Sequence, residues 1–367
     1  PDELLSEALA PEDMALWMYT SGTTGRPKAV VHMVKTIYKT ERYFSEVFGV
    51  GPGDIVFSSS KLFFAYASGH VLLAGVRLGA TLVLHAGWPA AEDISKVIAR
   101  YRPNIVLTVP TLYRNLLRDG FAEDAAFKDV RHFISAGEQL PRSLFDRWRD
   151  ATGKPLLDCI GATENLMLFV GNRPHDFEPG ASGKPMPHTE TRLMTEGREL
   201  VTEPGTPGIL WVKSDTLAAG YWGQEDRTND VFKDGWYCTN DVFLRDKEGR
   251  YFFQGRSDDM LKISGQWVSP AEIEAHVTKN PKVAQAVVVG VENDEGLVRL
   301  TLCMVPAAQD VDRKALEAEI TEELTAHLSI YKCPRRFFYM DDMPQTPTGK
   351  VQRFRVKEIV AIGMAAT

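Results

Sequence analysis

Residues 20–28 read Thr-Ser-Gly-Thr-Thr-Gly-Arg-Pro-Lys and could bind a chain of phosphates. The glycines let the backbone approach a ligand closely, so that backbone N–H groups can point at phosphate oxygens. The hydroxyls add donors, and Arg26 and Lys28 add positive charge. A glycine-rich surface loop is the alternative, but a short loop rarely carries so many phosphate donors. The string predicts a phosphate-binding loop made of Thr20, Ser21, Gly22, Thr23, Thr24, Gly25 and Lys28.

This loop differs from the P-loop of many kinases and ATPases. A P-loop needs glycine, lysine and serine or threonine in succession, opening a helix. Here Pro27 separates Arg26 from Lys28, and no Gly-Lys-Ser/Thr element follows. The spacing therefore argues against a P-loop kinase.

Four further motifs follow the loop: Gly-Ala-Thr-Glu at 161–164, Trp-Tyr-Cys-Thr-Asn-Asp at 236–241, Gly-Arg-Ser-Asp-Asp-Met-Leu-Lys at 255–262, and Pro-Gln-Thr-Pro-Thr-Gly-Lys at 344–350. With the loop, they closely resemble the motifs of the acyl-adenylate-forming (AMP-binding) superfamily of acyl-CoA synthetases, peptide-synthetase adenylation domains and luciferases. Five ordered matches are far more specific than one. The resemblance implies an enzyme that uses ATP to convert a carboxylic acid into an acyl-AMP and passes the acyl group to the thiol of coenzyme A.

The resemblance assigns the adenylation step to three residues. Lys350 matches the catalytic lysine that bridges carboxylate and phosphate oxygens, although a lone lysine in such a loop is usually a solvated surface charge. Thr163 would bind the α-phosphate, and Glu164 would bind Mg²⁺. A positioned cation and a metal ion stabilise the charge that develops on the α-phosphate. The alternative for Glu164 is a structural position beside a helix N-cap.

The resemblance also implies an adenosine site. Asp241 would accept hydrogen bonds from both ribose hydroxyls, and Arg256 would donate to the same sugar. A surface salt bridge is the alternative for Arg256. The family often has a tyrosine at the position of Ile160, but an isoleucine can still pack apolar surface on the ring, and Asp158 could accept from the adenine amino group. The predicted adenine contacts are Gly137, Glu138, Asp158 and Ile160.

Asp258 resembles the hinge about which the C-terminal domain of the family rotates between two half-reactions. One orientation would bring Lys350 to ATP. The other would bring residues 262–267 to the site and open a tunnel for the pantetheine arm of coenzyme A. An ordinary interdomain linker is the alternative for Asp258. The residues predicted for this thioester step are Lys262, Ser264, Gly265 and Trp267.

Residues 61–70 mix aromatic and small side chains and could form a flat acyl pocket, although a buried helix start is the alternative. This segment and residues 160–164 most resemble the benzoate-CoA ligase branch, which implies an aromatic acid. Acetate-activating relatives carry a bulky tryptophan at the position of Gly161, so this glycine implies a deeper pocket. Met167 replaces a polar residue of that branch and makes one wall more apolar. The predicted pocket residues are Phe64, Ala65, Tyr66, Gly161 and Met167.

Other functions stay open at this point. A medium-chain acyl-CoA synthetase, or a ligase that delivers to a carrier-protein thiol, would carry the same motifs. Family members usually have well over a hundred further residues before the phosphate loop, so the chain is expected to be N-terminally truncated relative to the family. A truncated chain could bind ATP without efficient turnover.

The composition of the chain limits the kinds of partner that it is expected to bind. The 367 residues carry a formal net charge of −7, which argues against nucleic acid because phosphate-binding surfaces usually need a basic excess. No apolar run approaches the ~20 residues of a membrane span. Four scattered cysteines without a CxxC pair fit reduced thiols in the cytoplasm. The expected partners are a small carboxylic acid, ATP with Mg²⁺, and coenzyme A, with a homodimer left open.

Strands alternate with helices between residues 55 and 160. This rhythm predicts an α/β fold with a layered, mostly parallel sheet, in which ligands bind at the C-terminal ends of the strands. Before it, residues 1–16 are expected to form a short helix and linker, and residues 32–48 a helix. The strands are expected at 16–19, 29–31, 55–57, 81–84, 105–109, 131–135 and 156–160, and the intervening helices at 69–78, 91–101, 112–118 and 141–152.

The texture of the sequence changes at about residue 184, where short β-like runs lie between turn residues. After residue 258 comes a compact α+β pattern, with helices expected near 270–279 and 311–328 and strands near 284–291, 298–305 and 336–340. The predicted domains are a partial N-terminal AMP-binding domain over 1–257 and a small mobile α+β C-terminal domain over 258–367. The first is divided into an α/β part (1–183) and a β-rich subdomain (184–257).

Overall fold

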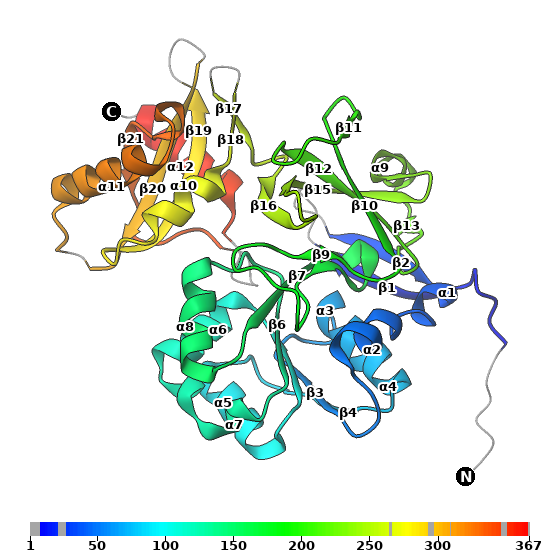
Figure 1. Ribbon diagram of the computed structural model, residues 1–367. Coiled ribbons are helices and arrows are strands. Elements are labelled where there is room, and N and C mark those ends of the chain that lie inside the picture. Colours follow the sequence, from blue (N-terminus) through cyan, green and yellow to red (C-terminus); the bar gives the residue numbers. More distant parts are fainter. Residues whose placement is uncertain are drawn as a thin grey trace. The chain divides into compact units, whose positions relative to one another are not determined.

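The computed structural model describes residues 8–20, 27–263, 266–292, 297–308, 310–345 and 351–365. The chain divides into two compact units (Figure 1). The first consists of Pro1–Thr239 and Phe243–Phe253, and the second of Asn240–Val242 and Gln254–Thr367. The domain bounds inferred from the sequence stay a prediction. Within the described residues, none of the helices combines the length and the apolar character needed to cross a bilayer.

A seven-stranded sheet is the largest sheet of the first unit, with the order β4-β3-β5-β6-β7-β8-β9. Neighbours from β4 to β7 are parallel, whereas β8 and β9 extend the sheet antiparallel. The strand expected over residues 81–84 ends at Val83, and Leu84, which follows it, is exposed. The bounds are β3 (Ile55–Ser58), β4 (Thr81–Val83), β5 (Ile105–Thr108), β6 (His132–Ser135), β7 (Leu156–Gly161), β8 (Leu168–Gly171) and β9 (Lys184–Pro185).

Helices cover both faces of this sheet (Figure 1). Because successive strand side chains point to opposite faces, Val56 lies in one core and Phe57 in the other. The predicted layered α/β fold is therefore confirmed. On the Val56 side lie α2 (Arg42–Phe48), α3 (Ala65–Ala67), the π-helix η1 (Ser68–Ala74) and α4 (Gly75–Arg77). On the Phe57 side lie α5 (Ala91–Tyr101), α6 (Pro110–Arg118), α7 (Ala125–Lys128) and α8 (Arg142–Thr152).

The predicted helix over residues 32–48 is wrong. β2 (Lys28–Met33) runs past His32 because it pairs antiparallel with β1 (Met14–Thr20), as far as Met33 opposite Met14. Backbone groups engaged in that ladder cannot also form helical hydrogen bonds. The helical part is limited to α1 (Val34–Ile37) and α2. β1 likewise replaces the end of the helix and linker expected over residues 1–16, of which residues 1–7 lie outside the described residues.

Two smaller sheets contain most of the segment after residue 184. The β-rich subdomain predicted there is confirmed. One has the order β11-β10-β12-β15-β14, with β16 paired to β15. The other has the order β1-β2-β13, in which β13 pairs antiparallel with β2. The bounds are β10 (Thr189–Met194), β11 (Leu200–Val201), β12 (Gly208–Ser214), β13 (Gly220–Tyr221), α9 (Glu225–Val231), β14 (Phe232–Lys233), β15 (Trp236–Arg245) and β16 (Tyr251–Arg256).

The second unit is built on the sheet β19-β20-β21, in which β20 pairs antiparallel with β19 and parallel with β21. Helices α10 and α11 share one hydrophobic core with this sheet, and α12 packs in a second core. The expected α+β pattern is present, and α12 was not foreseen. The bounds are β17 (Leu261–Ile263), β18 (Gln266–Val268), α10 (Pro270–Val277), β19 (Val283–Glu292), β20 (Val298–Pro306), α11 (Arg313–His327), β21 (Arg336–Tyr339) and α12 (Arg353–Ala365).

We expect Trp148→Ala to lower the free energy of unfolding by about 3–5 kcal/mol, because it empties a large volume in a close-packed core. Trp148 is fully buried on α8, with its ring centroid 4.7 Å from that of Tyr113 and 5.0 Å from that of Phe133. Chemical denaturation measures the change. The matched control is Trp88→Ala, since Trp88 is 68% exposed and its loss should cost less than about 0.5 kcal/mol. Equal losses in the two variants would contradict this assignment of the core.

Candidate active site

A lysine, a tyrosine and a glutamate from three separate segments meet in the first unit. The Nζ of Lys28 donates to the hydroxyl of Tyr221 at 3.2 Å, and that hydroxyl donates to Oε1 of Glu164 at 2.7 Å. The Lys28 Nζ lies 3.7 Å from the same carboxylate oxygen and 4.3 Å from the centroid of the Tyr221 ring. The side chains of Lys28 and Glu164 are only 14% and 8% exposed. We call these three residues the phosphate-side cluster.

Strand pairing produces this cluster. Lys28 opens β2, and β13 pairs with β2 so that Tyr221 lies opposite Val30. Glu164 lies in the short 3-10 helix η3 (Thr163–Asn165), which begins two residues after the C-terminal end of β7. The structure therefore brings together two residues that the sequence predicted separately, Lys28 and Glu164. A single buried carboxylate beside a lysine also fits Mg²⁺, which proteins often bind through one or two carboxylates together with substrate phosphates.

The remaining residues of the predicted phosphate loop are only partly described. Thr20 ends β1 and lies directly opposite Lys28 in the antiparallel ladder, so the two ends of the loop are adjacent. Ser21, Gly22, Thr23, Thr24 and Gly25 lie outside the described residues.

His32 holds the backbone next to Glu164. Its Nε2 lies 2.8 Å from the carbonyl oxygen of Thr163, to which it can only donate, so Nε2 carries the proton. Burial lowers the pKa of His32, which favours the neutral ring. On the other side, the Ala218 N–H donates to the Glu164 carbonyl at 2.8 Å. Because side chains alternate along a strand, Lys28, Val30 and His32 lie on one face of β2. This alternation could have indicated from the sequence that His32 lies on the same face as Lys28.

The chain then reverses in a strained turn. Leu166 has φ +63° and ψ −36°, and the Met167 N–H donates to the Asn165 carbonyl at 2.6 Å, which closes a three-residue turn. A non-glycine residue in such a conformation costs of order 1–3 kcal/mol and persists where its surroundings hold it. Asn165 supplies that support, because its Nδ2 donates to the Met167 carbonyl at 2.8 Å. Its Oδ1 accepts from the hydroxyls of Ser214 (2.5 Å) and Thr216 (3.3 Å).

The predicted acyl-pocket residues gather around this turn. A Cβ added to Gly69 would lie 2.5 Å from the Leu166 carbonyl oxygen and 2.7 Å from Sδ of Met167, so the 64–70 segment is packed directly on Met167. A Cβ added to Gly161 would lie 3.0 Å from the Met167 carbonyl oxygen. Ala65 and Met167 are buried members of one core, and Tyr66 packs against it. Phe64 is half-buried beside Ala65.

Two further residues fix the 64–70 segment: His70, the last residue of the segment 61–70 predicted for the acyl pocket, and Tyr43, which sequence reasoning missed. Nδ1–H of His70 donates to the Tyr66 carbonyl at 2.8 Å, which leaves Nε2 to accept from the hydroxyl of Tyr43. That hydroxyl also accepts from the Leu168 N–H at 3.2 Å. Complete burial lowers the pKa of His70 to about 4, so the ring is neutral at neutral pH. Burial also raises the pKa of Tyr66, whose hydroxyl donates to the Ile134 carbonyl at 3.0 Å.

The predicted adenine contacts lie on or just after two neighbouring parallel strands. Gly137, at φ +90°, and Glu138 follow β6, while Asp158 and Ile160 lie on β7. Asp158 has a buried Oδ1 without a hydrogen-bond partner among the described residues, and burial raises the pKa of its carboxyl group well above the usual range. A buried acceptor without a donor fits a ligand amino group. Oε2 of Glu138 instead accepts from N and Oγ1 of Thr111, at 3.0 and 2.7 Å.

The other predicted site residues belong to the second unit. Arg256 Nη1 donates to Asp241 Oδ1 at 3.1 Å, so the two predicted ribose ligands are adjacent. Asp258 is exposed in the turn after β16. Lys262 and Trp267 pair across the β17–β18 hairpin through their backbones. Ser264, Gly265 and Lys350 lie outside the described residues.

A family model described as "AMP-binding enzyme" matches residues 2–222, and one described as "AMP-binding enzyme C-terminal domain" matches residues 272–350. The chain belongs to the AMP-binding enzyme family. It is 46% identical over 363 residues to a 3-hydroxybenzoate–CoA ligase of Aromatoleum sp. (strain CIB), covering 99% of this chain and 69% of the relative. It is 37% identical over 348 residues to a benzoate–CoA ligase of Thauera aromatica, covering 95% and 66%.

Solved structures agree with this membership. The crystal structure of the anthranilate CoA ligase AuaEII in complex with anthranoyl-AMP superposes with a TM-score of 0.88 at 33% identity, covering 97% of this chain and 69% of that one. A benzoate CoA ligase from Burkholderia xenovorans LB400 gives a TM-score of 0.83 at 35% identity, covering 95% and 70%. The predicted class, an AMP-forming acid–thiol ligase that uses ATP and coenzyme A, is confirmed, as is its resemblance to the benzoate-CoA ligase branch.

We expect Tyr221→Phe to lower kcat/KM for adenylate formation by about 10- to 100-fold. The variant removes the hydroxyl that joins Lys28 to Glu164, and a hydrogen bond to a charged group contributes about 1.5–3 kcal/mol. ATP-dependent release of pyrophosphate measures the effect. The matched control is Tyr251→Phe, since Tyr251 is also buried in the first unit and its hydroxyl contacts Oγ1 of Thr191. An equal loss in the control would mean that the effect reflects stability rather than the cluster.

Proposed function

We propose that this protein forms the coenzyme A thioester of an aromatic carboxylic acid, with a hydroxybenzoate as its preferred acid. One observation carries the proposal: the phosphate-side cluster and the apolar 64–70 segment are joined within one unit by the turn at Leu166. An acid bound against Met167 thus lies a few residues along the chain from the phosphate ligands Thr163 and Glu164.

The phosphate side binds ATP and activates the acid. Lys28 and Thr20 donate to phosphate oxygens, and Thr163 binds the α-phosphate. Glu164 would hold Mg²⁺, and the ion would supply positive charge beside the α-phosphate. His32 keeps the backbone of Thr163 in place through its carbonyl, so this part of the chain does not have to be ordered when substrate binds.

The acid side selects a flat, apolar acid. Tyr66 offers one face of its ring, and Met167 offers a polarisable thioether that contacts aromatic rings favourably. Gly161 lets its own strand pack closely on the Met167 backbone, since a Cβ there would lie 3.0 Å from the Met167 carbonyl oxygen. The relatives support the choice among aromatic acids. At 46% and 45% identity the chain is similar to ligases named for 3-hydroxybenzoate and for 3- and 4-hydroxybenzoate, and at 37% to one named for benzoate.

The second unit completes both half-reactions. Asp241 and Arg256 hold the ribose, Lys350 bridges the carboxylate and phosphate oxygens during adenylation, and Asp258 is the hinge. Residues 262–267 then guide the coenzyme A thiol, with Gly265 giving the arm close passage. Coenzyme A is favoured over other acceptors because the ligases named for CoA are 46% to 32% identical, whereas p-hydroxybenzoic acid–AMP ligases are 31% identical.

The choice of acid is tested by a panel of 3-hydroxybenzoate, 4-hydroxybenzoate, benzoate, anthranilate and octanoate. ATP-dependent formation of each CoA thioester is followed by chromatography, with pyrophosphate release as an independent readout. We expect a hydroxybenzoate to give the highest kcat/KM, at least about tenfold above octanoate, since a flat pocket discriminates by about 1–3 kcal/mol. Faster turnover of octanoate would replace the proposal by a medium-chain acyl-CoA synthetase.

The role of Lys350 is tested by separating the half-reactions. We expect Lys350→Ala to lower adenylate formation by about 100- to 1,000-fold, because it removes a positioned charge from the transition state. Conversion of a supplied acyl-adenylate to the thioester should stay within about threefold of the wild-type rate. Lys357→Ala, an exposed lysine on α12, is the control and should leave both steps unchanged. Equal losses in the two half-reactions of Lys350→Ala would refute the assigned role.

A further inference from the structure

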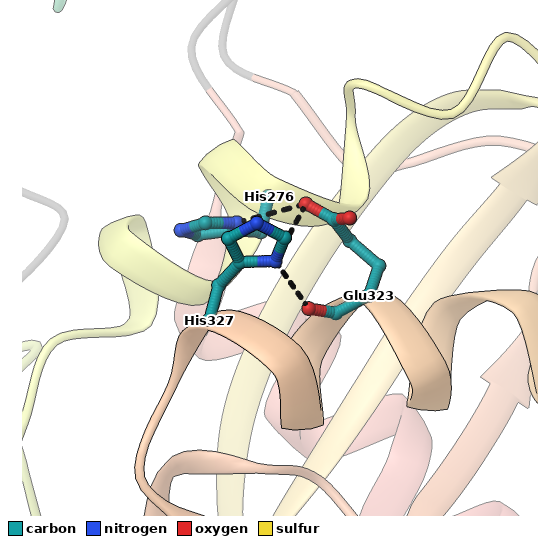
Figure 2. A group of neighbouring side chains, drawn as sticks. All are labelled: His276, Glu323 and His327. Atoms are coloured by element: carbon teal, nitrogen blue, oxygen red, sulfur yellow. Dashed lines mark hydrogen bonds and ion pairs between the residues drawn. The ribbon is translucent and has the colours of Figure 1, made fainter.

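Two histidines and a glutamate from two helices of the second unit turn toward one another (Figure 2). His276 lies near the C-terminal end of α10, and Glu323 and His327 lie on the last turns of α11. Nδ1 of His276 is 3.1 Å and Nδ1 of His327 is 3.5 Å from Oε1 of Glu323. The two imidazole rings are 5.3 Å apart between centroids, and one ligand atom from each residue lies within 4.8 Å of the others.

This donor set suits a transition-metal ion. Two imidazoles and one carboxylate, with a fourth position left to water, form a recurring zinc site. With metal–ligand bonds of 2.0–2.1 Å, neighbouring ligand atoms of a tetrahedral site are about 3.3 Å apart. The two nitrogen–oxygen distances of the cluster, 3.1 and 3.5 Å, lie on either side of that value. A small shift of the Glu323 carboxylate would therefore let all three residues reach one ion.

The positions of the three ligands are fixed by the helices that carry them. Glu323 and His327 are four residues apart and so lie on the same face of α11. Helices α10 and α11 share the hydrophobic core of the second unit, through Ile273, Val277, Leu316, Ile320 and Leu324. The His276 ligand thus comes from an element already held against α11, so an ion would not have to bring the two helices together.

A cation already lies beside these atoms. The Nζ of Lys279 is 3.7 Å from Oε1 of Glu323 and 3.2 Å from Nδ1 of His276. A plain network of hydrogen bonds is the competing explanation, because Nδ1–H of His327 also donates to the Glu323 carbonyl at 2.9 Å. Metal binding through that nitrogen would give up this bond and move the proton to Nε2.

We infer that His276, Glu323 and His327 form a binding site for one divalent transition-metal ion, with Zn²⁺ as the ion to test, and that the ion links α10 to α11. The site is separate from the residues proposed for ATP, coenzyme A and the acid. It would act as a metal-dependent stabiliser of the second unit, because an ion that binds the folded state shifts unfolding to higher temperature.

The test uses the whole protein without a histidine tag, freed of metal by a chelator that is then removed. Calorimetric titration with Zn²⁺ in the presence of excess Mg²⁺ should show one equivalent bound, since Mg²⁺ prefers oxygen ligands. His276→Ala and His327→Ala should each weaken binding at least about tenfold and abolish the zinc-induced rise in melting temperature. The matched control is His188→Ala, because His188 pairs with Glu46 at 3.0 Å as a single histidine–glutamate contact.

A second variant separates a metal site from a hydrogen-bond network. Lys279→Met removes the competing ammonium and should tighten Zn²⁺ binding several-fold, the opposite direction to the histidine variants. Melting temperatures in the presence of chelator check that each variant folds. Zinc affinity that is unchanged in His276→Ala and His327→Ala, or lowered as much by His188→Ala, would overturn the inference. So would a Lys279→Met variant that binds zinc no better than the wild type.

Discussion

The reversal of the chain at Leu166 is the constraint on which the candidate active site depends. Leu166 is buried at positive φ, two residues after Glu164, which faces Lys28, and one before Met167, which packs on the 64–70 segment. A side chain in this conformation is unfavourable by itself, so its surroundings must stabilise it. The amide of Asn165 does so through three hydrogen bonds, and Gly69 leaves the space that the Leu166 carbonyl and the Met167 thioether occupy.

Two neutral histidines extend this support to either side of the turn. His32 donates to the Thr163 carbonyl, and His70 donates to the Tyr66 carbonyl. Burial lowers the pKa of both rings, and a neutral imidazole keeps one donor and one acceptor at a fixed place. A charged ring would have to be desolvated at these buried positions, which costs far more than a hydrogen bond returns. Both histidines therefore act as uncharged links between backbone segments.

The sequence was sufficient to predict features that depend on residues close together in the chain. The alternation of strands and helices from residue 55 to 160 predicted the parallel sheet, and short motifs predicted Lys28 and Glu164. Residues whose partners lie far away in the chain were missed: Tyr221 is 57 residues from Glu164 and 193 from Lys28. The helix expected over 32–48 failed for the same reason, since pairing with β1 decides the conformation of β2. The secondary-structure propensity of one segment does not depend on which strand pairs with it in the fold.

If Thr163 and Glu164 bind ATP and Met167 contacts the acid, as proposed above, the way the turn is held separates the binding of ATP from the choice of acid. His32 and Asn165 bond to the carbonyl groups of Thr163 and Met167, so the backbone is fixed whatever side chain stands at position 167. Replacing that side chain would reshape the wall against the acid while leaving Thr163 and Glu164 where they are. Relatives named for 3-hydroxybenzoate, benzoate and anthranilate are 46%, 37% and 32% identical to this chain. On the function proposed above, a turn that is anchored through its backbone lets the acid side change at position 167 without moving the proposed phosphate ligands.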